Sequence, residues 1–308
     1  MSAPSTATPT GRWLRRAWLV PVALLVIIGV VLLAQWVRSM SSVQSFLADY
    51  PGQSELPAAA PVGLPAWLGW QHGLNAFFML FIIRSGLQVR FRRRPPAYWT
   101  RENKGLLRTK GQPVRVSIDV WLHIVFDSLW ILNGVVFLVL LFVTGQWLRV
   151  VPTSWDIIPN AVSAALQYVS LNWPTENGWV NYNALQVLAY FVVIFVAAPL
   201  SLITGLRTAP GFASRLRPLD KAFPVPVARK LHFWLMVFFV LFIAVHVTLV
   251  LATGALRNLN HMYASRDEVS WIGFAIFVGS LLVMGAAWFA LRPVVVRTLA
   301  GFTGRVSR

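Results

Sequence analysis

The chain has 308 residues, of which 57% are hydrophobic and only 12% charged, and its mean hydropathy is +0.63. Soluble domains are about 45 to 50% apolar and roughly 25% charged, so the composition predicts an all-α integral membrane protein. The net charge of +17 would suggest nucleic acid in a soluble protein, but Lys and Arg gather on the cytoplasmic side of membrane proteins, and we expect no nucleic-acid partner. The absence of cysteine excludes Cys-ligated iron–sulfur clusters, disulfides and covalently attached c-type haem.

Six stretches are long and apolar enough to cross a bilayer, which takes about 20 helical residues. They are predicted at 18–37, 66–86, 119–143, 184–206, 231–254 and 270–291. The first has the basic start of a signal peptide. Its apolar run is longer than the roughly 7 to 15 residues of a signal core and lacks a clear Ala-x-Ala site, so we expect a retained anchor.

We divide the chain into three regions, and see no internal repeat and no separate soluble domain. Residues 1–65 would form a tail, the anchor helix and an outer loop; residues 66–254 a four-helix core; and residues 255–308 an outer loop, the last transmembrane helix and a basic tail. The loop 144–183 contains "PNAVSAALQYVSL", which predicts a short amphipathic helix at the membrane surface.

The distribution of Lys and Arg predicts the orientation. Twenty-three of the 27 basic residues fall before the first span, in 84–118, in 207–230 and after residue 291. Basic residues favour the cytoplasmic side, so we expect both termini and these two loops there, in a multi-pass protein of the cytoplasmic membrane. The loops 38–65, 144–183 and 255–269 would then face outward.

Four of the five histidines lie inside predicted spans, where polar side chains are costly and are functional-site candidates. His232 and His246 are 14 residues apart, so they share a helical face and are separated by about 21 Å along the axis. His72 and His246 are expected about 9 and 12 Å below the outer boundary, whereas His123 and His232 are expected within about 6 Å of the inner one. The histidines therefore form two pairs at matching depths.

Two stacked histidine pairs, each joining two helices, are what two six-coordinate b-type haems require. We accordingly predict His72 with His246, and His123 with His232, as axial ligands of the iron of two haems b. A zinc or copper site would need more ligands at one depth. Proton relay and purely structural histidines remain the alternatives.

The histidine spacing and the stretch "NYNALQVLAYFVVIFVAAPLSLITGL" resemble the di-haem cytochrome b subunits of bacterial formate dehydrogenases and nickel–iron hydrogenases. The resemblance covers residues 66 to about 254. In that family an Asn/Gln pair, an aromatic residue and a Thr-Gly pair mark the helix before the double-histidine helix. Their counterparts here are Asn183, Gln186, Tyr190, Thr204 and Gly205. The resemblance implies haem-ligand roles for the four histidines named above.

Four further polar residues are candidates for supporting roles. Asp127 follows His123 by four residues, so it shares a helical face and could orient the imidazole or accept a quinol proton; a carboxylate paired with a basic loop residue is the alternative. Asn75 and Arg84 could contact haem or quinone, although hydrogen bonds between helices explain them adequately. His261 could contact a haem propionate or a partner, but a solvated loop histidine is an equal alternative.

These features together predict a membrane di-haem cytochrome b that transfers electrons between the quinone pool and a partner oxidoreductase subunit. Oxidation or reduction of a quinone at a site of its own would accompany that transfer. The long outer loop favours an extracytoplasmic partner, and the resemblance implies a metal-containing subunit such as a molybdopterin oxidoreductase. The alternative function is a proton-coupled transporter that uses its intramembrane histidines.

Overall fold

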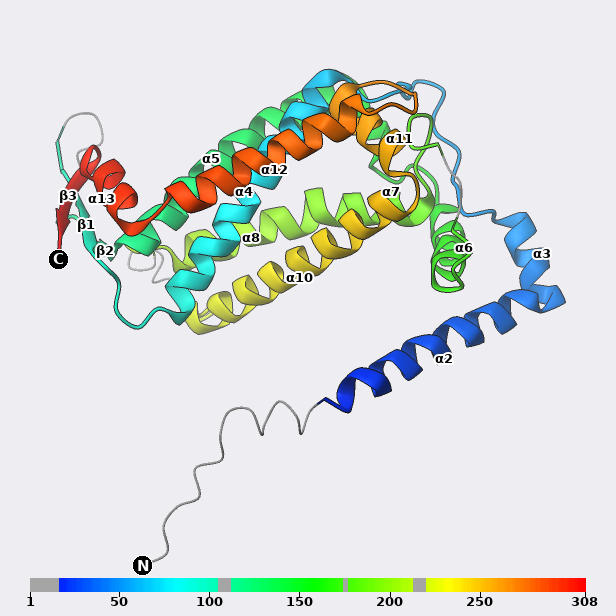
Figure 1. Ribbon diagram of the computed structural model, residues 1–308, viewed down its shortest axis with the longest axis horizontal. Helices are drawn as coiled ribbons and strands as arrows, with labels where there is room; N and C mark the ends of the chain where they lie inside the picture. The colour runs from blue at the N-terminus through cyan, green and yellow to red at the C-terminus, as the bar shows by residue number, and fades with distance from the viewer. Residues whose placement is uncertain (1–16, 105–111, 174–176, 213–219) are drawn as a thin grey trace, which may run out of the picture.

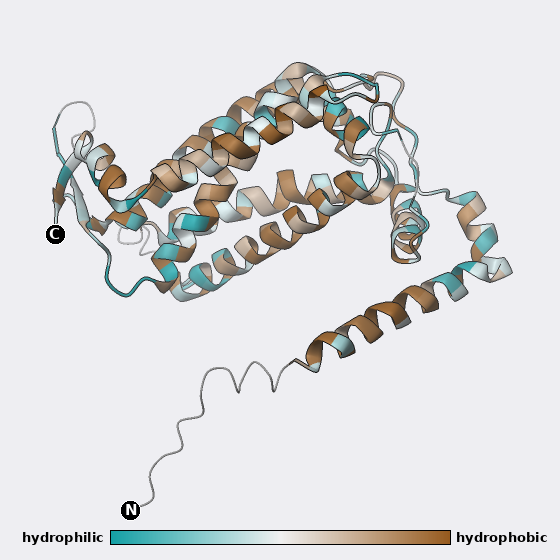
Figure 2. Ribbon diagram, in the orientation of Figure 1, coloured by the Kyte–Doolittle hydropathy of each residue, from teal (hydrophilic) through white to brown (hydrophobic). Residues whose placement is uncertain are grey.

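A computed structural model describes residues 17–104, 112–173, 177–212 and 220–308. The basic residues that we expected before the first span, and parts of both basic loops (105–111 and 213–219), lie outside the described residues. The described part of the chain contains six helices long and apolar enough to cross a membrane, which confirms the predicted class of an all-helical, multi-pass membrane protein. Their outward surfaces are mostly apolar, and polar residues gather at the two ends of the bundle (Figure 2).

Four of the six spans form the core. They are α4 (Ala66–Phe91), α5 (Ile118–Val143), the composite span Ala184–Thr208 and α10 (Val225–Ala252). The composite span consists of α7 (Ala184–Phe191), a π-helical segment η3 (Val192–Ala197) and α8 (Ala198–Thr208). Proline has no N–H with which to bond the carbonyl four residues earlier, so the widened turn lies where Pro199 interrupts the normal ladder.

The core helices pack as two antiparallel pairs, α4 with α5 and α8 with α10. The two pairs approach each other mainly at mid-height, where Met79 of α4, Ala197, and Leu235 and Phe239 of α10 form a buried apolar cluster. The sixth span, α12 (Ile272–Ala290), lies along α4 and α5 (Figure 1). The cluster therefore joins the two helix pairs between the ends of the bundle.

One end, which we call the cap end, is closed by the segments 50–65, 145–173, 177–183 and 255–271. It contains the helices α6 (Ile157–Val169) and α11 (Ala255–Leu259), the 3₁₀ turn η2 (Gln146–Arg149) and the π-helical segment η5 (Asn260–Ala264). The buried Arg149 donates hydrogen bonds to the carbonyls of Gly63 (2.8 Å) and Gly178 (2.7 Å), and so joins two of these segments. The surface helix expected in the loop 144–183 is present as α6.

The first span, α2 (Leu19–Ser39), stands apart from the four-helix core (Figure 1). It continues into the short helix α3 (Ser41–Asp49). Only its cap-end turn is attached: Gln35 donates to the carbonyl of Ser170, and Arg38 donates to the Ser170 hydroxyl at 2.9 Å. Most of its apolar side chains are exposed, as expected of a helix that contacts lipid.

The other end, which we call the basic end, carries a small sheet that we did not predict. The strands are β1 (Tyr98–Arg101), β2 (Arg115–Ser117) and β3 (Gly304–Ser307), in the antiparallel order β2-β1-β3. The pairing brings the C-terminal tail, which follows helix α13 (Pro293–Gly301), onto the loop between α4 and α5. Each strand has only three or four residues, and β3 pairs with a strand about 200 residues earlier, so the sheet has no local sequence signal.

Candidate functional site

The structure brings the four intramembrane histidines together in two pairs. His123 of α5 faces His232 of α10 toward the basic end, with ring centroids 6.3 Å apart and ring planes at 88°. His72 of α4 faces His246 of α10 toward the cap end, with centroids 6.1 Å apart and planes at 82°. We call these the basic-end pair and the cap-end pair. Both join the two helix pairs across the space between them.

The separation of the rings suits a metal ion held between them. Two imidazoles on opposite sides of one ion have centroids roughly 6 Å apart, because a metal–nitrogen bond is about 2 Å long and the ring adds about 1 Å on each side. Each pair offers only two nitrogen ligands, and the described residues contain no cluster of three or more His, Cys, Asp or Glu side chains that could hold a bare ion. A metal whose other ligands come from a macrocycle fits this donor set.

The basic-end pair is oriented by two hydroxyl groups. Ser85 Oγ lies 2.9 Å from His123 Nδ1, and Thr204 Oγ1 lies 2.9 Å from His232 Nδ1. Each hydroxyl also donates to a carbonyl one turn earlier in its own helix, that of Phe81 at 2.7 Å and that of Leu200 at 2.7 Å. The hydroxyl oxygen therefore accepts the Nδ1 proton, which leaves the Nε2 lone pair of each ring for a metal.

A glycine follows each of these hydroxyl residues and lets the histidine ring approach its helix. A Cβ on Gly86 would lie 3.2 Å from His123 Cε1, and one on Gly205 would lie 3.5 Å from His232 Cε1. The first distance is tighter than ordinary van der Waals contact, so a side chain at Gly86 would displace the ring. Gly205 came from the family resemblance, whereas Ser85 and Gly86 were missed. The repeated hydroxyl–glycine dipeptide was the signal that could have revealed them.

The cap-end pair is surrounded by aromatic rings. Phe242 lies one turn before His246 on α10 and stacks on its ring at 5.6 Å and 5°, while Tyr190 of α7 meets the same ring edge-on at 6.3 Å. Tyr263 of η5 lies 5.9 Å from His72. The segment η5 crosses α4 closely there, since a Cβ on Gly69 would overlap the carbonyl oxygen of Met262. These contacts position the rings by packing.

Two buried polar atoms beside the cap-end pair have no hydrogen-bond partner in the part of the chain that the structure describes. They are Trp67 Nε1 and Gln71 Oε1, both on α4 near His72. Buried polar groups in native proteins are normally satisfied by protein, water or ligand. These orphaned atoms fit a polar-edged group bound near the cap end of α4.

Asp127 lies beside the basic-end pair but does not orient it. Its Oδ2 atom is 3.6 Å from His123 Nε2, too far for a hydrogen bond, and the atom it approaches is not the Nδ1 that Ser85 holds. Its side chain remains 33% exposed. The carboxylate is thus close to the basic-end pair and partly open to the surroundings of the bundle.

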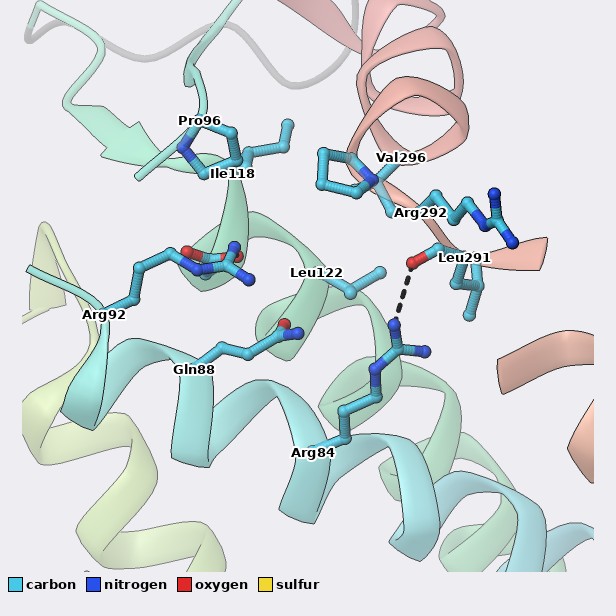
Figure 3. A pocket seen from close by; sticks show the side chains of 11 residues that line it. Arg84, Gln88, Arg92, Pro96, Ile118, Leu122, Leu291, Arg292 and Val296 are labelled. Atoms are coloured by element: carbon cyan, nitrogen blue, oxygen red, sulfur yellow. Dashed lines mark hydrogen bonds and ion pairs between the residues drawn. The ribbon is translucent and has the colours of Figure 1, made fainter. Parts of the chain in front are cut away.

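The structure gives Asn75 and Arg84 interhelical partners. Asn75 accepts a hydrogen bond from Trp130 Nε1 of α5 at 2.8 Å. Arg84 donates to the carbonyls of Trp288 (2.9 Å) and Leu291 (3.0 Å) and stacks 4.4 Å from the Trp288 ring, as Figure 3 shows in part. Arg84 therefore satisfies orphan carbonyls at the end of α12.

His261 is not the solvated loop residue that we kept as one alternative. It is only 4% exposed, its Nε2 lies 2.8 Å from Asp267 Oδ1, and its ring packs 5.4 Å from that of Trp179. Burial lowers its pKa, so Nε2 donates to the carboxylate as part of a neutral ring. Hydrogen bonds from His261, Asn177 and Arg257 hold the pKa of Asp267 at about 2. The hydrogen bond between His261 and Asp267 thus stabilises the cap end.

Comparison with known proteins agrees with this geometry. A family model described as prokaryotic cytochrome b561 matches residues 63–265, which include all four core helices. Members of that family bind haem b and transfer electrons within membranes. No curated protein and no solved structure matches the chain. Because the family model covers more than half of the sequence, the chain belongs to the prokaryotic cytochrome b561 family of membrane b-type cytochromes.

Proposed function

We propose that this protein is a di-haem cytochrome b that carries electrons across the membrane between a quinone and a partner oxidoreductase subunit. The observation that carries the proposal is the presence of two histidine pairs, at 6.3 and 6.1 Å, that share the helix α10. Haem b supplies one-electron redox chemistry when it is bound. His123 and His232 would hold one haem, and His72 and His246 the other.

Different residues of the chain would then support the two haem sites. Ser85 and Thr204 keep the Nε2 atoms of the basic-end pair unprotonated, while aromatic rings exclude water from the cap-end pair. The 14 residues between His232 and His246 separate the two centres by about 21 Å along α10, so two carriers divide the crossing into shorter steps. We assign the di-haem core to residues 66–254, flanked by the N-terminal anchor region (residues 1–65) and the C-terminal region (residues 255–308).

The orientation follows from charge. We place the basic end and both termini on the cytoplasmic side of the cell membrane, and the cap end outside, because Lys and Arg concentrate at the basic end. The extent of the cap end supports an extracytoplasmic redox partner, and a molybdopterin oxidoreductase would suit it. Asp127, partly exposed beside the basic-end pair, is our candidate acceptor for a quinol proton.

Quinol oxidation tests the quinone role separately from haem binding. The purified protein is mixed anaerobically with a short-chain quinol, and haem reduction is followed in the visible spectrum. We expect both haems to be reduced, and Asp127→Asn to slow their reduction by quinol while leaving haem content and reduction by dithionite unchanged. Haems that dithionite reduces but no quinol reduces would contradict the quinone role alone.

The transporter alternative makes the opposite prediction. It requires no haem, and the family match favours the cytochrome. A purified protein that carries no haem and moves protons in liposomes would overturn the proposal.

A further inference from the structure

Two hollows at the basic end differ in whether their cations have hydrogen-bond partners within the described residues. The first, of about 120 Å³, is drawn in Figure 3 and lies between α4, α5 and the start of α13. Its three arginines all have partners within the chain: Arg84 donates to the α12 carbonyls, Arg92 to Asp119 at 2.6 Å, and Arg292 to the Phe289 carbonyl at 3.2 Å. Each cation of this hollow thus donates to an oxygen of the chain.

The second hollow is larger, about 370 Å³, and its cations lack such partners among the described residues. It lies between the end of α4 and the start of α10, and its lining residues are Arg90, Pro226, Arg229, Lys230, Phe233 and Trp234. The lining contains three cations and no carboxylate. Within the described residues, none of these three cations forms an ion pair or a hydrogen bond. Arg90 instead stacks 3.9 Å from the Phe233 ring, which joins the two helices across the hollow.

The hollow lies where the helices meet the membrane surface. Arg90 is the last residue but one of α4, and the other lining residues belong to the first three turns of α10. Trp234 is 56% exposed, on the surface that contacts lipid. Tryptophan near a helix end is typical of the headgroup level, and the start of a helix adds partial positive charge to the three cations.

We propose that this hollow binds the headgroup phosphate of an anionic phospholipid. A phosphodiester accepts charge-assisted hydrogen bonds from guanidinium and ammonium groups, and basic pockets between transmembrane helices are suited to such headgroups. The acyl chains would extend from the hollow past Trp234 along the exposed face of α10. The proposal requires only that the chain spans a membrane, and does not depend on the proposed electron-transfer function.

The outward position of the exposed Trp234 in the lining favours a lipid over a haem propionate as the anion. Each residue advances a helix by about 100°, so Trp234 lies roughly 200° around α10 from His232. Trp234 thus faces away from the basic-end pair, whereas Phe233 lies about 100° and Arg229 about 60° around the helix from His232. Arg90, Arg229 and Lys230 are all exposed, so an anion can approach from the membrane.

Lipid binding to matched variants tests the inference. The delipidated holoprotein is titrated with phosphatidylglycerol or phosphatidylcholine of the same acyl chains, or with inorganic phosphate, and bound lipid is counted by native mass spectrometry. We expect selective retention of phosphatidylglycerol. The triple variant Arg90→Gln, Arg229→Gln, Lys230→Gln should bind it on the order of a hundredfold more weakly, because each cation contributes about fivefold near an anionic surface.

The control variant Arg93→Gln, Arg94→Gln removes charge at the same surface but outside the hollow, and should bind the lipid like the native protein. The single variant Arg229→Gln repeats the test with less disturbance of the fold, and an unchanged haem spectrum confirms that each variant is folded. Three results would each overturn the inference: equal binding by the triple and control variants, equal retention of both lipids, or equivalent binding of inorganic phosphate. A changed haem potential with unchanged lipid binding would instead assign the cations to a propionate.

Discussion

The two histidine pairs have nearly the same ring separation and angle, yet the chain holds them in different ways. In the basic-end pair each Nδ1 atom is 2.9 Å from a hydroxyl group, and a glycine beside that hydroxyl gives the ring its space. In the cap-end pair, neither ring has a hydrogen-bond partner among the residues that the structure describes. Stacked and edge-on aromatic side chains surround it instead.

This difference shows that one ligand geometry can be achieved by two kinds of support. A hydrogen bond to Nδ1 fixes the tautomer and the rotation of the ring and makes Nε2 a stronger ligand. Aromatic packing fixes the position of the ring but leaves its tautomer free. We therefore expect the basic-end pair to depend on single polar atoms, and the cap-end pair to tolerate single substitutions better.

The largest effect is expected from removing a ligand. His246→Ala should abolish haem binding at the cap end and leave the other haem, and His232→Ala should do the reverse, because each histidine belongs to one pair only. Haem content per chain, measured as pyridine haemochrome, should fall by half in each variant. Loss of the basic-end haem alone from His246→Ala would refute the pairing.

Removing the hydroxyl groups should weaken the basic-end site only. Ser85→Ala or Thr204→Val leaves Nδ1 of one ring without its acceptor, and loss of such a supporting contact typically costs about 10- to 100-fold in metal affinity. Haem retention during dilution, together with a potentiometric titration, measures the effect. We expect one haem to be lost or shifted in potential.

Two other hydroxyl residues provide matched controls. Ser128 and Thr248 donate to the carbonyl four residues earlier, at 2.8 Å in both cases, but contact no histidine. Ser128→Ala and Thr248→Val should leave both haems unchanged. If they weaken haem binding as much as the Ser85 and Thr204 variants do, the hydroxyl groups act on helix stability and not on the histidines.

A smaller effect is expected at the cap end. Phe242→Leu keeps an apolar side chain beside His246 but removes the stacked ring, and an aromatic pair contributes about 0.5 to 1.5 kcal/mol beyond its buried area. Haem retention at the cap end should fall severalfold at most. A loss as large as that of Ser85→Ala would remove the distinction between the two kinds of support.

The smallest effect concerns the closure of the cap end and its dependence on pH. Hydrogen bonds hold the pKa of Asp267 at about 2, below its ordinary 3.8, so its stabilising contribution is complete above pH 3.8 and is lost as the pH falls toward 2. Burial lowers the pKa of His261, so acid also favours its unfolded, protonated form. Asp267→Asn should lower the melting temperature at pH 7, and the difference from the native protein should narrow as the pH falls through this window. A difference that widens in acid would show that the carboxylate is not ionised in the folded cap.

The sequence predicted the features that follow from the helical repeat or from the free-energy cost of polar side chains in lipid. Apolar runs gave six spans within a few residues of their observed bounds, except that α4 and α10 extend about one and a half turns further at the basic end. The 14-residue spacing on α10, combined with alternating helix direction, predicted which histidines lie together. Both inferences depend only on helix geometry and on the cost of polar groups in lipid.

Other features depend on contacts between distant segments, which a local pattern does not contain. The strand β3 pairs with β1 about 200 residues earlier. The partners of Arg84 and His261 come from the end of a helix and from a loop, which have no periodicity. Ser85 was overlooked because a serine inside a span usually bonds only its own helix, as Ser128 does. Its functional contact appears only when α4 and α5 are placed together.

The most direct test is the number and ligation of the haems in the purified protein. A dithionite-reduced minus oxidised spectrum with pyridine haemochrome quantification should give two haems b per chain, and the electron paramagnetic resonance spectrum of the oxidised protein should show low-spin iron. Because the paired rings lie at 82° and 88°, the signals should be of the strongly anisotropic kind that nearly perpendicular imidazoles produce. One haem per chain, or high-spin iron with a single histidine ligand, would contradict the two bis-histidine sites.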